Sequence, residues 1–276
     1  MPPMRTFHLI QVSDTHLGRE QSWFAPNFRA MARIVSALRP DLVVNTGDIS
    51  FDGAERDDDL AFARGCHAEL DVPFRAIPGN HDVGDNPWRD DGPETITEQR
   101  LERYRRHFGE DYWLHEAGRW VLLGLNVQLF GSGMAAEKDQ WRFLASAASM
   151  TSGRPIALFV HKPLFHLHAG EADVNHRFVP PDHRRRLIEL LGGANVRLVA
   201  SGHVHQHRRH RVGDVDHCWA PSTAFVLPDR RQPRLGTKHV GYIDYTFDED
   251  RVDIQVVEPE QLMNHNLDDF PDAHAI

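Results

Sequence analysis

The sequence Gly79-Asn80-His81-Asp82 is the starting point for interpreting this chain. It follows the apolar run 72–78, and a strand ending there delivers an amide, an imidazole and a carboxylate into one loop. Alone, the tetrapeptide is an ordinary turn, because glycine and asparagine are common turn residues. Four further polar clusters, however, also stand at the ends of apolar stretches: Asp14-Thr15-His16, Gly47-Asp48, His161 and Gly202-His203-Val204-His205.

The apolar runs before these clusters have the length and composition of buried strands. They cover residues 7–12, 42–44, 74–78, 156–160 and 196–200. Continuous β-branched runs of this kind are typical of strands covered on both faces. Helical spacing of apolar residues lies between them, at 28–38, 59–70, 137–148 and 182–191. This alternation predicts βαβ units and a largely parallel sheet.

Two regions depart from the alternation. Residues 113–116 and 120–125 flank Ala117-Gly118-Arg119 and are predicted to form a hairpin. After His205, the runs 209–212, 215–219, 240–247 and 252–257 are predicted to be consecutive antiparallel strands of a second sheet packed against the first. Residues 1–258 are therefore expected to form a single domain. The acidic tail, 259–276, is expected to lie on the surface or to fray, and it is a candidate oligomer contact.

The clusters together supply a set of ligands for metal ions. In open α/β sheets, ligands gather at the carboxyl ends of strands, so distant clusters can converge there. Oxygen and imidazole nitrogen without thiolate suit Zn, Mn or Fe. Seven ligands are too many for one tetrahedral ion but suit two ions about 3.5–4 Å apart. The seven are Asp14, His16, Asp48, Asn80, His161, His203 and His205. One carboxylate must then bridge the ions, and Asp48 is the best candidate because Gly47 permits a tight turn beneath them.

The bulk properties exclude several classes of protein. The 276 residues carry a net charge of −9, which argues against wholesale nucleic-acid binding and against an anionic membrane surface. No stretch approaches the roughly 20 apolar residues that span a bilayer. The N-terminus has no signal-peptide pattern, so we expect a cytoplasmic protein. Cys66 and Cys218 form no motif and are expected to be buried or half-buried thiols without a disulfide.

In their order and spacing, the five motifs closely resemble those of the calcineurin-like metallophosphoesterase superfamily. The resemblance implies an α/β fold, a four-layer αββα sandwich of two mixed β-sheets flanked by helices. It implies that one metal is held by Asp14, His16, Asp48 and His205, and the other by Asp48, Asn80, His161 and His203. It further implies that His81 lies on the phosphate side, where it stabilises the transition state or protonates the leaving oxygen. Asp82 would orient His81.

The compact form of the motifs is most similar to class III cyclic-nucleotide phosphodiesterases and their glycerophosphodiesterase relatives. We therefore expect hydrolysis of a small phosphodiester, with a 3′,5′-cyclic nucleotide as one candidate, by a hydroxide that bridges the metals. Two divalent ions, two aspartates and this hydroxide leave a charge of about +1, which favours an anionic ester. A phosphomonoesterase or protein phosphatase remains the alternative. A nuclease is disfavoured by the acidity, and a non-catalytic scaffold by the complete ligand set.

Several residues near the motifs lie outside the ligand set. Lys162 stands where many such enzymes carry a second histidine, and is expected to add positive charge near the phosphate or to face solvent. The long loops 83–94, which contains Trp88, and 163–180 are expected to be lids or specificity elements. Solvated positions are expected for His166, His168, His176 and the helical run Arg184-Arg185-Arg186, and an edge strand for the basic segment 207–211. The resemblance is compatible with a homodimer or higher homo-oligomer.

Overall fold

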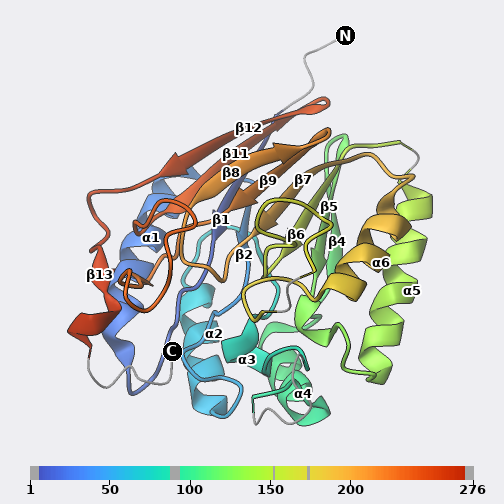
Figure 1. Cartoon of the computed structure of the whole chain (residues 1–276). Coiled ribbons are helices and arrows are strands. Elements are labelled where there is room, and N and C mark those ends of the chain that lie inside the picture. Colours follow the sequence, from blue (N-terminus) through green and yellow to red (C-terminus); the bar gives the residue numbers. More distant parts are fainter. Residues whose placement is uncertain (1–5, 88–93, 152, 173–174, 271–276) are drawn as a thin grey trace.

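The computed structural model describes residues 6–87, 94–151, 153–172 and 175–270. Two β-sheets lie face to face, and helices cover the outer side of each (Figure 1). The predicted four-layer arrangement is therefore confirmed. Within the described residues, no helix combines the length and the apolar character needed to cross a membrane.

The first sheet has five strands in the order β12-β11-β1-β2-β3. Its strands are β1 (Phe7–Val12), β2 (Leu42–Asn45), β3 (Phe74–Ala76), β11 (Tyr242–Asp248) and β12 (Arg251–Val257). Strands β1, β2 and β3 are parallel, whereas β11 is antiparallel to both of its neighbours. The three predicted site clusters that follow β1, β2 and β3 therefore lie at the same end of this sheet, where the carboxyl ends of these strands meet.

The second sheet has six strands in the order β4-β5-β6-β7-β9-β8. Its strands are β4 (Trp113–Ala117), β5 (Trp120–Leu125), β6 (Ile156–Val160), β7 (Val196–Ser201), β8 (Arg208–Val212) and β9 (Val215–Trp219). Strands β5, β6, β7 and β9 run parallel, and the hairpin partners β4 and β8 close the two edges. The predicted hairpin and the predicted edge strand are both confirmed.

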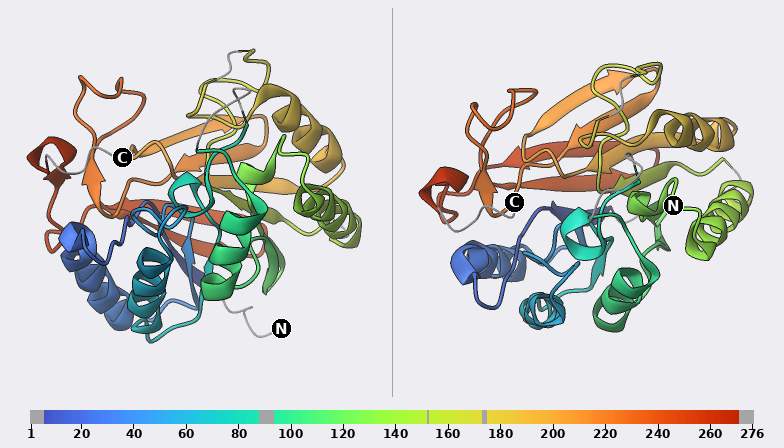
Figure 2. Two further views of the ribbon diagram at one scale, coloured as in Figure 1. Left: turned by 90° about the horizontal axis from the view of Figure 1, so that it is seen from below. Right: turned by 60° about the horizontal axis from the view of Figure 1, so that its bottom comes forward.

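The helices form the two outer layers (Figures 1 and 2). They are α1 (Ala25–Leu38), α2 (Asp57–Ala68), α4 (Glu98–Phe108), α5 (Ala135–Met150) and α6 (Pro181–Leu191). The short helix α3 (Asn80–Val83) follows β3 and carries Asn80 and His81. Helix α1 packs Met31 and Val35 against Ile10 of the first sheet. Helices α5 and α6 pack against the second sheet, with Leu144 and Leu187 in its outer core. These contacts use the apolar stripe that the 3.6-residue period places on one face of each helix.

The central core lies between the two sheets. Leu9 and Val44 of the first sheet contact a cluster that includes Leu122 and Phe159 of the second. Burying a side chain of this size contributes roughly 1.5–3 kcal/mol, so the interface is a major source of stability. The indole Nε1–H of Trp113, in the second sheet, also donates to the Ala76 carbonyl oxygen, 2.8 Å away, at the end of β3 in the first. This hydrogen bond thus joins the two sheets close to the strand ends that carry the site clusters.

The distribution of strands differs from the prediction. The five site-bearing strands do not share one sheet, because β1, β2 and β3 belong to the first and β6 and β7 to the second. Nor do the late strands form a sheet of their own, since β8 and β9 extend the second sheet and β11 and β12 extend the first. Apolar runs report that a strand is buried, and they do not say which neighbour it pairs with.

Two further segments correct the sequence-based picture. Helix α4 was not predicted, although Leu101, Tyr104 and Phe108 have helical spacing and Thr97 caps its first turn by accepting from the Arg100 N–H. The tail was expected to lie on the surface or fray. Up to residue 270 it is packed instead: β13 (His265–Asn266) pairs with β10 (Phe225–Val226), and Leu262 and Leu267 are buried. Cys66 and Cys218 are free and buried, as predicted.

Candidate metal centre

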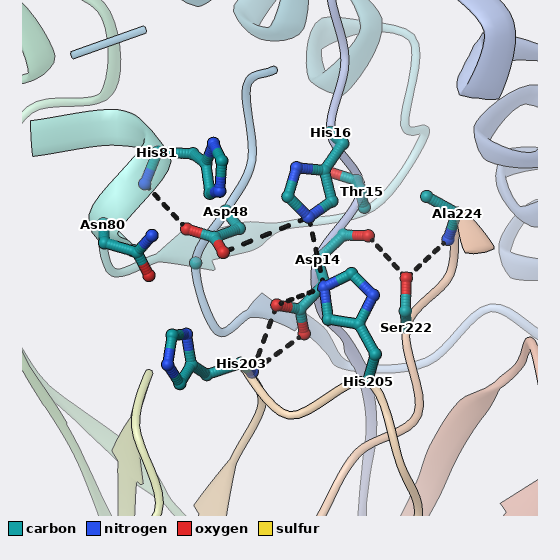
Figure 3. A network of polar contacts seen from close by, with 12 residues as sticks. Asp14, Thr15, His16, Asp48, Asn80, His81, His203, His205, Ser222 and Ala224 are labelled. Carbon is teal, nitrogen blue, oxygen red and sulfur yellow. Dashed lines mark hydrogen bonds and ion pairs between the residues drawn. The ribbon is translucent and has the colours of Figure 1, made fainter. Parts of the chain in front are cut away.

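All seven predicted ligands converge at the carboxyl ends of strands from both sheets, and all of them except His161 are labelled in Figure 3. Two groups of side chains have ligand atoms within 4.8 Å of one another: Asp14, His16, Asp48 and His205 in one, and Asp48, His161 and His203 in the other. Asp48 belongs to both groups. Asn80 adjoins the second, with its Oδ1 3.2 Å from His161 Nε2. The arrangement suits a binuclear centre with one shared carboxylate.

The backbone at these positions is strained. Five candidate ligands have positive φ angles, namely Asp14 (53°), His16 (42°), Asp48 (49°), His203 (66°) and His205 (50°). Only two other non-glycine residues among those described, Arg39 and Glu249, share this conformation. Such conformations cost about 1–3 kcal/mol each and persist where the surrounding structure enforces them, often at functional sites. The left-handed turns also let His203 and His205, two residues apart, join different groups.

Two glycines make the close approach of these clusters feasible. A Cβ atom on Gly47, whose φ is +101°, would lie 2.6 Å from the Gly79 nitrogen and 2.6 Å from His161 Nδ1. A Cβ atom on Gly79 would collide with the Asp48 carboxylate and backbone nitrogen. Because neither position has room for a side chain, the shared carboxylate can lie directly against the turn that begins α3.

The hydrogen bonds of the histidines test whether the site fits a cation. His161 Nδ1 lies 2.8 Å from the Thr46 carbonyl oxygen, and His203 Nε2 lies 2.9 Å from that of His176. A carbonyl only accepts, so these nitrogens donate. The remaining nitrogens, His161 Nε2 and His203 Nδ1, then face each other at 3.1 Å. A proton or a metal ion must be shared there, because two lone pairs repel.

The other group shows the same feature. His205 Nδ1 donates to the Phe225 carbonyl oxygen at 3.2 Å, which leaves its Nε2 directed at His16 Nε2, 3.2 Å away. His16 Nδ1 is buried and has no hydrogen-bond partner among the described residues. The same His205 Nε2 lies 3.4 Å from an oxygen of Asp14. The chemistry of the donor set therefore fits a divalent ion in each group.

The electrostatics of the site agree with this fit. Burial lowers the pKa of His16 and of His203 well below the usual range, so both imidazoles are neutral, as ligation requires. Burial opposes ionisation of Asp48, but the neighbouring His161 and His81 hold the pKa of Asp48 well below its usual value. Burial likewise lowers the pKa of His161, but Asp48 outweighs it and raises that pKa to about 9. A cation bound there would displace this proton.

His81 stands beside the ligands. Its backbone N–H donates to Asp48 Oδ1 at 2.9 Å, and its ring makes an edge contact with that of His16. Its Nδ1 lies 2.9 Å from the Phe51 carbonyl oxygen. Since Nδ1 is engaged and His81 lines the cavity, Nε2 is the nitrogen available to a bound ligand.

The expected contact between Asp82 and His81 does not form. The Asp82 carboxylate is fully buried and accepts from the backbone N–H groups of Ile49, Ser50 and Gly79 and from the Ser50 hydroxyl. The Phe51 carbonyl orients His81 instead. Asp82 therefore fastens the turn at Gly79 to the loop after Asp48, a structural task that sequence adjacency to His81 does not reveal.

Two basic residues also differ from expectation. Lys162 is 1% exposed and neither faces solvent nor lines the cavity, because its Nζ pairs with Asp85 and donates to Asn86 Oδ1 at 3.1 Å. Arg184 was expected on a solvated helix face. It is also 1% exposed, and it donates to the carbonyl oxygens of Leu164 and Glu171. Both cationic side chains can be buried because residues of other segments supply their ion-pair and hydrogen-bond partners.

A cavity of about 290 Å³ opens above the candidate ligands. Five residues of the candidate centre line it, namely Asp48, Asn80, His81, His203 and His205. The other lining residues, which we call the outer wall, are His176, Arg177, Leu227, Arg231 and Gln232. Of the three loop histidines considered from sequence, His176 reaches the cavity, whereas His166 packs beside Phe178 and Trp219. Arg177 and Arg231 were missed, since no motif marks them. Residues 88–93, which include Trp88, lie outside the described residues.

Comparison with known proteins places this geometry in a family. The model of the calcineurin-like phosphoesterase family matches residues 7–207. A probable glycerophosphodiester phosphodiesterase of Arcobacter nitrofigilis is 28% identical over 220 residues, covering 72% of this chain and 71% of that protein. The serine/threonine-protein phosphatase CPPED1 of Bos taurus is 27% identical over 229 residues, covering 73% of this chain and 70% of that protein.

A solved structure shares the fold. A dimetal phosphatase from Danio rerio superposes with a TM-score of 0.59 at 16% identity, covering 91% of this chain and 97% of that one. The family match spans every motif from Asp14 to His205. This chain therefore belongs to the calcineurin-like phosphoesterase family.

Proposed function

We propose that the protein is a phosphodiesterase that uses two divalent metal ions to hydrolyse a small phosphodiester. The observation that carries the proposal is the pair of ligand groups that share Asp48, with His81 beside them at the floor of an open cavity. Asp14, His16, Asp48 and His205 would hold one ion. Asp48, Asn80, His161 and His203 would hold the other. Mn, Fe and Zn all suit these donors.

The chain's own residues would divide the work. Two bound ions supply Lewis acidity and a water of lowered pKa. Because only Asp14 and Asp48 among the seven ligands are anionic, the loaded site stays positive and attracts a phosphoester. Asn80 contributes a neutral oxygen and preserves that charge. His81, held through Nδ1 by the Phe51 carbonyl, would donate from protonated Nε2 to the departing oxygen.

The preference for diesters is supported by the similarity to the glycerophosphodiester phosphodiesterase of Arcobacter nitrofigilis. A phosphatase acting on monoesters is the second candidate, because CPPED1 is similar to nearly the same extent. A 3′,5′-cyclic nucleotide is one diester of suitable size for the cavity. The ligand set is complete, so a scaffold without catalysis is the least supported alternative.

The test is turnover by the Mn-loaded protein of bis-p-nitrophenyl phosphate, p-nitrophenyl phosphate and 3′,5′-cyclic AMP. We expect kcat/KM for the diester to exceed that for the monoester at least tenfold, and the His81→Ala variant to lose most of this activity. His107→Ala, on α4 and outside the cavity, is the matched control. Turnover of the monoester alone would establish the phosphatase instead.

A further inference from the structure

The outer wall of the cavity is basic, although the whole chain is acidic. Arg177 belongs to the loop before α6, and Arg231 to the loop between β10 and β11. Both loops rise from the same side of the molecule, in yellow and orange, in both views (Figure 2). Two separate segments thus bring guanidinium groups to one opening.

Arg177 has no compensating partner among the residues that the structure describes. Its Nε is buried and makes no hydrogen bond, and no described carboxylate forms an ion pair with its guanidinium. A buried donor left without an acceptor costs about 1–3 kcal/mol. Such a group in a cavity wall indicates an acceptor supplied from outside the chain.

The position of Arg177 is fixed by its neighbours on both sides. The His176 carbonyl accepts from Nε2 of His203, a candidate metal ligand. Phe178 packs with Val204 and Trp219 in a buried cluster. Arg177 is therefore held next to a residue that contacts the metal centre, and its loop is anchored where the side chain leaves it.

The second arginine of the outer wall is also held in place. Arg231 pairs with Asp268 through its Nε at 3.0 Å, and Arg230 pairs with the same carboxylate. Gln206 ties this loop down by accepting from the Leu235 and Gly236 N–H groups. The two guanidinium groups that line the opening, Arg177 and Arg231, and the Asp268 carboxylate together carry a formal charge of +1.

We propose that this opening selects linear phosphodiesters in which one ester arm carries a further phosphate group, and that Arg177 binds that phosphate. The inference rests on the proposed function. The metal centre accounts for the ester phosphate, so the unpaired guanidinium serves a second anion. A phosphate group carries the charge opposite to that of the unpaired Arg177 guanidinium, and the planar guanidinium fork matches its oxygens. A cationic arm would be repelled, and a cyclic nucleotide has no such arm.

The experiment compares two diesters that release the same p-nitrophenolate. One is p-nitrophenyl thymidine 5′-phosphate, and the other is its 3′-phosphorylated analogue. The metal-loaded wild type, Arg177→Gln, Arg177→Lys and the matched control Arg185→Gln are assayed for kcat/KM. Arg185 lies on α6, is exposed and pairs with Asp182 outside this cavity. Calorimetric binding of thymidine 5′-phosphate and thymidine 3′,5′-bisphosphate, with metal content checked, gives a readout independent of turnover.

We expect the 3′-phosphate to raise kcat/KM and product affinity about 10- to 100-fold in the wild type and in Arg185→Gln, the range of an ionic hydrogen bond. In Arg177→Gln both ratios should fall below about 2, and in Arg177→Lys they should be intermediate. Wild-type ratios near 1 would overturn the inference, and so would ratios that are unchanged in Arg177→Gln. In either case, turnover of the diesters would leave the proposed function intact. If no diester is turned over, the proposed function fails and the binding ratios still decide the role of Arg177.

Discussion

Replacing Asp82 by asparagine should destabilise the fold while leaving the chemistry of the folded protein in place. The buried carboxylate accepts four hydrogen bonds, from Ile49 N at 3.1 Å, Ser50 N at 2.9 Å, Ser50 Oγ at 2.6 Å and Gly79 N at 2.8 Å. An asparagine offers one acceptor oxygen, and its NH₂ group would face donors. At least two of the four donors would therefore lose their acceptor.

The size of the effect follows from these contacts. Each buried donor without an acceptor costs about 1–3 kcal/mol, so two give about 4 kcal/mol. A change of 1 kcal/mol lowers Tm by roughly 2–4 °C in a chain of this length, and we therefore expect a decrease of about 10 °C. The assay is thermal unfolding followed by circular dichroism, with Asp139→Asn as the control, because Asp139 lies on the exposed face of α5.

The kinetic profile separates this role from that of a residue that orients His81. Below its Tm, folded Asp82→Asn should keep the wild-type shape of the pH dependence of kcat, because His81 is oriented by the Phe51 carbonyl. A variant that unfolds within 2 °C of the wild type, yet has an altered pH profile, would refute the structural interpretation and restore the orienting role.

Three further predictions address other groups. Asn80→Ala should lose more bound metal than His81→Ala, which should keep its metal and lose about 10²–10⁴-fold in kcat; equal metal loss would mean that His81 is a ligand. Burial lowers the pKa of His67 to about 4 from 6.5, so the unfolded chain binds more protons between these values. Stability should therefore fall by about 3 kcal/mol as pH drops from 6.5 to 4, and urea titrations of His67→Gln should lack this loss. Lys162→Met should lower the unfolding free energy by about 3 kcal/mol because it leaves Asp85 unpaired, and adding Asp85→Asn should recover part of it in the same titrations.

The fold was largely predictable because its strands and helices are local patterns. The alternation of apolar runs and helical periods located nearly every element that bears the site, and each ligand follows such a run. The assignment of the strands to two sheets was not predictable from these patterns. It depends on contacts between residues far apart in sequence, such as those of Leu9 with the opposite sheet, and an apolar run does not specify its partners.

The site could be predicted where residue type carries the chemistry. Aspartate, asparagine and histidine gathered at strand ends supply the oxygen and nitrogen donors that divalent ions bind. The partners of Asp82, Lys162 and Arg177 were beyond the sequence for a different reason. Asp82 is held by backbone N–H groups, which nearly every residue possesses. Lys162 is buried through a residue 77 positions away, and Arg177 acquires its significance only from the cavity that it lines.

Metal stoichiometry tests the central claim most directly. The protein, reconstituted with Mn and freed of unbound ions, is measured by inductively coupled plasma mass spectrometry, alongside Asp48→Ala. Because Asp48 belongs to both ligand groups, the account predicts two ions per chain in the wild type and less than one in the variant. A wild type that binds one ion or only a trace, or an Asp48→Ala variant that retains two, would contradict it.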